Sequence, residues 1–156
     1  IEKQAVANNV SLDALVIEIT EQAAVRNMPA AARQIADFVA RGCKFAIDDF
    51  GAGYSSYAYL KTLPVALVKI DGSFVTNVVA DAIDQRIVSA ISQIAKAART
   101  KTIAEHVNDY DTFLLLGELG VDYAQGNLLG KPSAKLKPNV LPVPLKNEAE
   151  RILGTA

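Results

Sequence analysis

Several short apolar runs of the sequence carry, or end in, polar side chains that could do chemistry. The runs read LVIEIT, KFAIDD, ALVKID, TIAE and DYAQ, and their polar residues are Glu18, Asp48, Asp49, Lys69, Asp71, Glu105 and Gln125. If these runs are parallel strands, their carboxyl ends meet at one edge, where α/β folds build ligand sites. The pattern therefore predicts a single site that combines carboxylate, amide and ammonium groups.

The adjacent carboxylates of Asp48 and Asp49 indicate a cation. Neighbouring carboxylates repel one another unless a positive charge compensates them. Mg²⁺ prefers oxygen ligands, and two such ions can share a bridging carboxylate, so Glu18, Asp48, Asp49 and Glu105 could form a metal cluster. An isolated Asp-Asp pair is more often a turn residue followed by a solvent-facing one, and the pair alone is therefore a weak indication.

Lys69 lies among apolar residues at a predicted strand end. An isolated buried ammonium is costly, so it needs an anion, which could be Asp71, Asp48 or a ligand phosphate. A purely structural Lys–Asp pair explains Lys69 equally well. The glycines that follow Asp49, Gly51 and Gly53, give a loop that can approach a ligand or act as a hinge, although the loop lacks the features of a P-loop.

The elements that would position these residues are short strands alternating with longer helices, a pattern typical of an α/β fold with a parallel sheet. Runs such as LVIEI and ALVKI are almost continuously apolar, as in strands covered on both faces. The predicted strands are 15–20, 44–48, 66–70, 101–104 and 122–125. Helices are predicted at 29–41, at 81–99 with an apolar face that includes Ile83 and Ile91, and after a cap at Asn108 or Asp109, the last one ending at Gly117 or Gly120.

Composition limits the classes of partner. With 16 Lys and Arg against 17 Asp and Glu, the net charge of −1 gives no field that would recruit a DNA or RNA polymer or an anionic membrane. The single cysteine, Cys43, cannot form an intrachain disulfide and is expected in the core. No run of 18 apolar residues occurs, and we expect a cytoplasmic domain.

Four sequence blocks resemble one known family. They are IEITE (17–21), AIDDFGAGYSSYAYLKTLPVALVKIDGSFV (46–75), IAEHV (103–107) and AQGNLLGKP (124–132). They follow one another in the order and at the spacing of the EAL domain, the cyclic di-GMP phosphodiesterase fold of bacterial signalling proteins. The sequence is therefore identified as resembling an EAL domain from its start to about Pro132.

The resemblance implies a modified TIM (β/α) barrel, of which this chain holds only the carboxyl-terminal part. It also implies two Mg²⁺ or Mn²⁺ ions at the barrel rim and hydrolysis of one phosphodiester of cyclic di-GMP to linear pGpG. By position, Glu18 resembles a metal ligand of the family, Asp48 the ligand shared by both ions, and Asp49 a ligand of the second ion.

Five further residues match positions of known role in the family. Lys69 resembles the residue that contacts the attacking water and the phosphate, and Glu105 the acid proposed as base or as partner of the second metal. Gln125 resembles the amide that helps to order that site, and Asp71 a support for Lys69. Glu21 resembles the glutamate that anchors the DFGxGYSS loop, which in the family couples the site to a dimer interface, so a homodimer is expected.

The sequence lacks the Glu-Ala-Leu motif and the asparagine-bearing strand of the family, both of which would precede Ile1. We expect the chain to be the carboxyl-terminal part of a longer protein, fused to a sensory or GGDEF-type domain whose upstream segments could attach the protein to a membrane, and to be inactive alone. Residues 1–156 are expected to form a single domain, with its core to about 132 and with 133–156 as an irregular exit and a short helix near 147–153.

Three positions depart from the family pattern. Asn108 replaces the second glutamate of AEGVE, Asn127 replaces the tyrosine that usually follows Gln-Gly, and His106 is interpreted as a rim or packing residue in preference to a metal ligand. The two asparagines could weaken the second metal site or the grip on the nucleotide. The alternative function is therefore a catalytically inactive EAL domain that acts as a cyclic di-GMP receptor, or as a dimerisation module.

Overall fold

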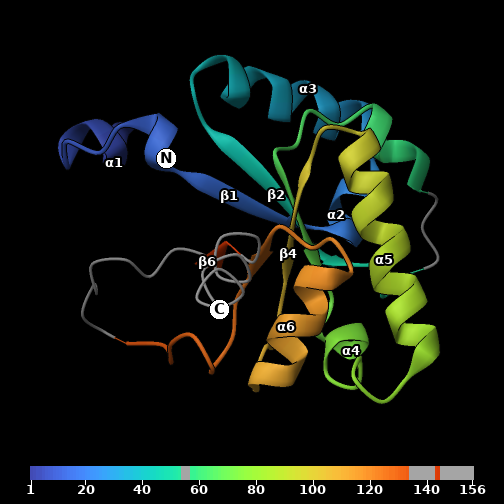
Figure 1. Ribbon diagram of the computed structural model, residues 1–156. Coiled ribbons are helices and arrows are strands. Elements are labelled where there is room, and N and C mark those ends of the chain that lie inside the picture. Colours follow the sequence, from blue (N-terminus) through green and yellow to red (C-terminus); the bar gives the residue numbers. More distant parts are fainter. Residues whose placement is uncertain (54–56, 134–142, 145–156) are drawn as a thin grey trace.

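A parallel sheet forms the centre of the molecule (Figure 1). The computed structural model describes residues 1–53, 57–133 and 143–144. Within them the strands are β1 (Val16–Thr20), β2 (Lys44–Phe50), β3 (Leu67–Ile70), β4 (Lys101–Ala104), β5 (Tyr123–Ala124) and β6 (Val143–Pro144). Strands β1 to β5 are parallel and lie side by side in chain order, and β6 pairs antiparallel with β5. The predicted α/β class and its five parallel strands are confirmed.

Helices connect the strands. They are α1 (Glu2–Ala7), α2 (Glu21–Arg26), α3 (Met28–Ala40), α4 (Gly72–Val75), α5 (Ala82–Ala97) and α6 (Tyr110–Glu118), with short 3₁₀ helices at Leu12–Ala14 and Tyr57–Lys61. Helix α3 packs against β2, and α5 packs against β3 and β4, so each covers strands that it connects. Figure 1 shows α1 beside the start of β1, away from α5 and α6.

Side-chain caps define where the long helices begin. The carboxylate of Asp81 accepts hydrogen bonds from the backbone N–H groups of Ile83 and Asp84, at 2.7 and 3.3 Å, and starts α5. Asp109, not Asn108, caps α6, because its carboxylate accepts a hydrogen bond from Thr112 N at 2.8 Å. Each cap satisfies a backbone donor that has no partner within the helix.

The predicted apolar face of α5 is confirmed in part. Ile91 is buried and Ile87, Ile94 and Ala98 are half-buried, whereas Ala90 is exposed and Ile83 is 69% exposed. Ile83 lies in the first turn of the helix, beside the Asp81 cap.

The central strands are covered on both faces and β1 is not. Val68, Lys69 and Ile70 of β3 are buried in succession, as the continuous apolar pattern predicts. In β1, exposed and half-buried residues alternate, and Val16 is 46% exposed. The prediction of two covered faces is therefore wrong for β1, because β1 is the first strand of the sheet and pairs only with β2 within the described residues.

Cys43 is buried and forms no disulfide with another described residue, as expected of the single cysteine in the core.

The carboxyl-terminal segment, predicted as an irregular exit, contributes β6, whose Val143 pairs with Ala124. The short helix predicted near 147–153 lies outside the described residues. None of the described helices is long and apolar enough to cross a membrane.

Candidate metal centre at the carboxyl ends of the strands

The structure brings predicted site residues from four strands together around one ammonium group. The Nζ atom of Lys69 lies 3.0 Å from Glu18 Oε2, 2.8 Å from Asp48 Oδ1 and 2.9 Å from Glu105 Oε1. Glu18 comes from β1, Asp48 from β2 and Lys69 from β3, while Glu105 directly follows β4. We call Glu18, Asp48, Asp49 and Glu105, the acids at this edge, the acidic cluster.

Lys69 is charged at the centre of this cluster. Its side chain is only 6% exposed, and burial by itself favours the neutral amine. The carboxylates of Asp48, Glu105 and Glu18 outweigh that effect and raise the pKa of Lys69 well above its ordinary value. Lys69 therefore offers a permanent positive charge to whatever binds at this edge.

Burial and Lys69 act on the pKa of Glu105 in opposite directions. Burial raises the pKa of Glu105, and the charge of Asp48 raises it further, although the hydrogen bond and the charge of Lys69 partly oppose the shift. The surplus of carboxylates over ammonium groups thus makes the edge negative, and one further positive charge would stabilise every ionised acid in it.

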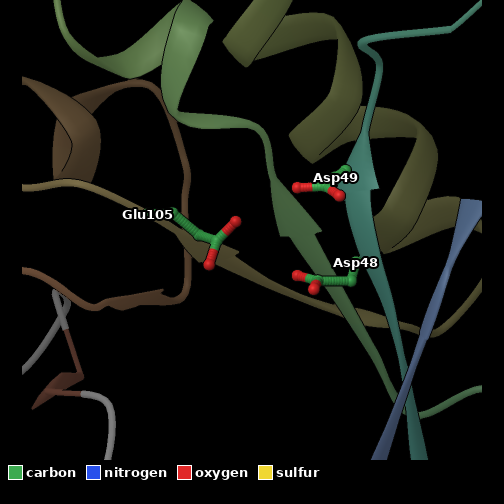
Figure 2. Close-up of side chains that lie close together, drawn as sticks. All are labelled: Asp48, Asp49 and Glu105. Atoms are coloured by element: carbon green, nitrogen blue, oxygen red, sulfur yellow. The ribbon is translucent and has the colours of Figure 1, made fainter.

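Asp48 and Asp49 point toward the same space although they are consecutive residues of β2 (Figure 2). In a regular strand, consecutive side chains alternate between faces. Here the pairing between β2 and β3 shifts register between Ile47 and Phe50, and Asp49 has a left-handed φ of 54°. This β-bulge turns the second carboxylate toward the first, which is a known use of bulges next to functional sites.

One oxygen each of Asp48, Asp49 and Glu105 forms a group whose members all lie within 4.8 Å of one another. Figure 2 shows the two aspartates on β2 facing Glu105 across a common space. The Oδ1 atom of Asp48 lies 2.8 Å from Lys69 Nζ. Three carboxylate oxygens this close together fit a hard divalent cation. Glu18 is not in this group, although its carboxylate, like those of Asp48 and Glu105, pairs with Lys69.

Glu21 lies beside the cluster as the first residue of α2 and is buried. Its Oε2 accepts a hydrogen bond from Gly51 N at 3.2 Å, and its Oε1 accepts one from the Tyr59 hydroxyl at 2.6 Å. Glu21 thus holds the backbone directly after the bulge. Sequence reasoning missed Tyr59, because a tyrosine within an apolar run has no local signal that distinguishes it from an ordinary core residue.

Asp71 and Gln125 make other contacts among the described residues. Asp71 caps α4 by accepting a hydrogen bond from Ser73 N at 2.8 Å and is not among the described ion-pair partners of Lys69. It lines a neighbouring cavity of about 330 Å³ together with Thr20, Glu21, Gln22, Asp49, Ala52 and Gly53. Gln125 is exposed just after β5, where its backbone N–H donates to Ala104 O at 2.8 Å.

The three departures from the family pattern lie in the loops that follow β4 and β5. Asn127 Nδ2 donates a hydrogen bond to Asn108 Oδ1 at 3.1 Å, so the two asparagines link these loops. His106 has a left-handed φ of 57°, and its ring packs so closely on Gly72 that a Cβ there would lie 2.2 Å from Nδ1. His106 is not in the ligand group of the described acids.

Comparison with known proteins agrees with this geometry. A model of the EAL domain family matches residues 1–132. "Cyclic di-GMP phosphodiesterase PdeF" of Escherichia coli is 42% identical over 118 residues, which are 76% of this chain and 16% of PdeF. The chain thus spans about a sixth of that relative.

Solved structures share the fold. The structure described as "PaMucR Phosphodiesterase, c-di-GMP complex" superposes with a TM-score of 0.80 at 36% identity, covering 84% of this chain and 53% of that one. A manganese/cy-diGMP complex of Klebsiella pneumoniae BlrP1 gives a TM-score of 0.78 at 26% identity, covering 83% and 33%.

The described α/β fold is therefore the expected part of a modified TIM barrel. The family match covers residues 1–132, which include Lys69 and the whole acidic cluster. The chain belongs to the EAL domain family.

Proposed function

We propose that the domain to which this chain belongs hydrolyses one phosphodiester bond of cyclic di-GMP and releases linear pGpG. The observation that carries this proposal is the acidic cluster around Lys69, with Asp48, Asp49 and Glu105 oxygens within 4.8 Å of one another. Relatives named as cyclic di-GMP phosphodiesterases and the cyclic di-GMP complex of PaMucR support the substrate.

The residues present fit Mg²⁺ or Mn²⁺. Asp48, Asp49 and Glu105 would hold one ion, and Glu18 with Asp48 would contribute to a second. When bound, such ions supply positive charge for the phosphate and lower the pKa of a water molecule. The manganese complex of BlrP1 supports this choice of metal.

Lys69 and Glu105 are the proposed catalytic residues. Lys69 is held in place by three carboxylates and would donate a hydrogen bond to a phosphate oxygen, where it offsets the charge that develops during the reaction. The pKa of Glu105 is raised by burial, which makes this carboxylate a better proton acceptor than an exposed one and suits it to act on the attacking water.

The remaining residues would act as supports. Glu21 holds Gly51 and thereby the glycine loop, and Gln125 presents an exposed amide at the same edge. Asp71 would support Lys69 by starting α4, not by direct contact. We also propose that the domain works as a homodimer in the cytoplasm and is fused to a sensory or GGDEF-type domain. For the fusion, support comes from the relative MucR, which is named as a bifunctional cyclase and phosphodiesterase.

The test is an assay of the full-length protein that contains this chain, with cyclic di-GMP and Mg²⁺. We expect pGpG as the product, and Asp48→Asn should abolish it because a charged ligand is lost. Cys43→Ala is the control, since Cys43 is buried and directly precedes β2, at the end of that strand opposite Asp48. This substitution should lower stability modestly and change turnover little. Absence of pGpG while the nucleotide still binds would refute the enzymatic proposal.

The second candidate is a cyclic di-GMP receptor without activity. It is favoured by the hydrogen-bonded pair of Asn108 and Asn127, which occupies the edge where the family has a glutamate and a tyrosine. Calorimetric titration with cyclic di-GMP separates the candidates, because the receptor binds without turnover. A domain that neither binds nor hydrolyses the nucleotide would leave dimerisation as its role.

A further inference from the structure

We propose that Tyr59 is a positioning residue for the carboxylates of Asp48 and Asp49. Tyr59 would act through Glu21 and the backbone of Gly51, without touching the metal or the substrate. The inference rests on the proposed metal-binding function of those aspartates. It assigns a role to a buried hydroxyl that the reaction itself does not use.

The first step is the hydrogen bond from Tyr59 to Glu21. The Glu21 side chain carries a charge and is almost completely buried, with the residue 3% exposed. Among the described residues, each of its oxygens receives one donor, the Tyr59 hydroxyl at 2.6 Å on Oε1 and Gly51 N at 3.2 Å on Oε2. A buried carboxylate that loses a donor cannot replace it from bulk water, so both hydrogen bonds fix its orientation.

The second step runs along the backbone from Gly51 to the aspartates. Gly51 has a φ of 97°, and a Cβ there would lie 3.0 Å from the ring of Phe74. Phe50 is completely buried, and its carbonyl accepts a hydrogen bond from Asp71 N at 3.2 Å. Gly51 is therefore bound by Glu21 and closely packed by Phe74, two residues after the left-handed Asp49 that turns its carboxylate toward Asp48.

The third step is the packing of Tyr59 itself. Its ring lies edge-on to Phe50, with centroids 6.0 Å apart and planes at 65°, and the residue is 2% exposed. The ring thus supports Phe50 while the hydroxyl supports Glu21. Because Tyr59→Phe keeps the ring and removes only the hydroxyl, the substitution separates positioning from core packing.

The chain offers a matched control for the loss of a buried hydroxyl. Thr100 is 4% exposed, and its hydroxyl donates to Val65 O at 3.3 Å, just before β4 and so at the end of that strand opposite Glu105. Thr100→Val removes this hydrogen bond and nearly preserves the shape of the side chain. It should lower the melting temperature without changing the acidic cluster.

The experiment is a titration of the chain with Mn²⁺ alone, in which free Mn²⁺ is followed by electron paramagnetic resonance. Substitution of a residue that orients metal ligands typically costs about 10- to 100-fold in metal affinity, and we expect a loss at the lower end of this range for Tyr59→Phe and none for Thr100→Val. A Tyr59→Phe variant that binds Mn²⁺ as tightly as the parent contradicts the inference alone. A parent chain that binds no Mn²⁺ contradicts the proposed function, and the inference falls with it.

Two further readouts test the route through Glu21. Amide exchange at Gly51 should become faster in Tyr59→Phe and stay unchanged in Thr100→Val, because only the first variant disturbs the acceptor of that N–H. The double variant Glu21→Gln with Tyr59→Phe should bind Mn²⁺ about as weakly as Glu21→Gln alone. Additive losses, or an unchanged Gly51 amide, would overturn the assigned route even if Tyr59→Phe proved unstable.

Discussion

Lys69 is the residue that gives the candidate site its electrostatic character. It is buried and pairs with acids from β1, β2 and the end of β4, so it compensates carboxylates that would otherwise repel. The sequence predicted the need for an anion near Lys69 but left the choice open between Asp71, Asp48 and a phosphate. The three-way contact depends on the register between strands, which residue types alone cannot reveal.

Replacing Lys69 by methionine should destabilise the chain and abolish turnover. The substitution leaves three close carboxylates without their ammonium, and breaking a buried ion pair costs about 3 kcal/mol. The control is Lys101→Met, since Lys101 is 58% exposed and pairs, within the described part of the chain, only with Asp122, and an exposed pair contributes less than about 1 kcal/mol. Urea unfolding in EDTA measures both variants. Equal losses would show that burial around Lys69 does not matter, and added Mn²⁺ should restore part of the Lys69→Met loss.

Asp122, at the opposite end of the sheet, predicts a dependence of stability on pH. Burial opposes ionisation, but hydrogen bonds from Lys101 and from Thr102 outweigh it and lower the pKa of Asp122 below its ordinary 3.8. A lowered folded-state pKa means that Asp122 contributes stability above the unfolded-state pKa and loses it as the pH falls through the folded-state value. The difference in unfolding free energy between the parent and Asp122→Asn should therefore shrink from pH 7 to pH 3. A difference that stays constant would contradict the assignment.

At the scale of elements, backbone hydrogen bonds join the two loops that follow β4 and β5. Val107 N donates to Gln125 O, and Leu128 N donates to Val107 O, each at 3.1 Å. Strand positions were predictable because near-continuous apolar runs are local features. The bulge at Asp49 and helix α2 were not, because both depend on contacts made after the chain has folded.

Gly126→Ala should disrupt this edge. A Cβ at Gly126 would lie 2.2 Å from Val107 O, which is backbone and cannot move aside, and overpacking of this kind costs about 1–3 kcal/mol. Gly130→Ala is the matched control, since nothing lies within 4 Å of a Cβ there. The melting temperature and the affinity for cyclic di-GMP should both fall in Gly126→Ala and stay unchanged in Gly130→Ala. A tolerated Gly126→Ala would mean that the two loops are not locked together.

At the scale of the whole molecule, β1 is an edge strand of the sheet within the described residues. Strand β1 pairs only with β2 among the described residues, and four valine and isoleucine side chains at or before it are exposed: Ile1 62%, Val6 77%, Val10 41% and Val16 46%. The sequence resemblance predicted the barrel-like order of strands. The alternating exposure of β1 follows from its position in the sheet, which its apolar sequence does not disclose.

An exposed strand edge next to apolar side chains should make this chain associate. We expect the sedimentation coefficient of the chain to rise with concentration, and Val16→Lys at the edge should reduce the increase. Val39→Lys on α3 is the control, since Val39 is similarly exposed at 38% but lies on a helix. Equal effects of both substitutions would mean that added charge, and not the strand edge, controls association.

The central claim is that the acidic cluster binds a divalent cation, and anomalous diffraction from crystals soaked in Mn²⁺ tests it most directly. The account predicts an anomalous peak bounded by the carboxylates of Asp48, Asp49 and Glu105, which is lost in Asp48→Asn. A cluster that stays closed around Lys69 with no peak, at Mn²⁺ concentrations that saturate a typical site, would contradict it.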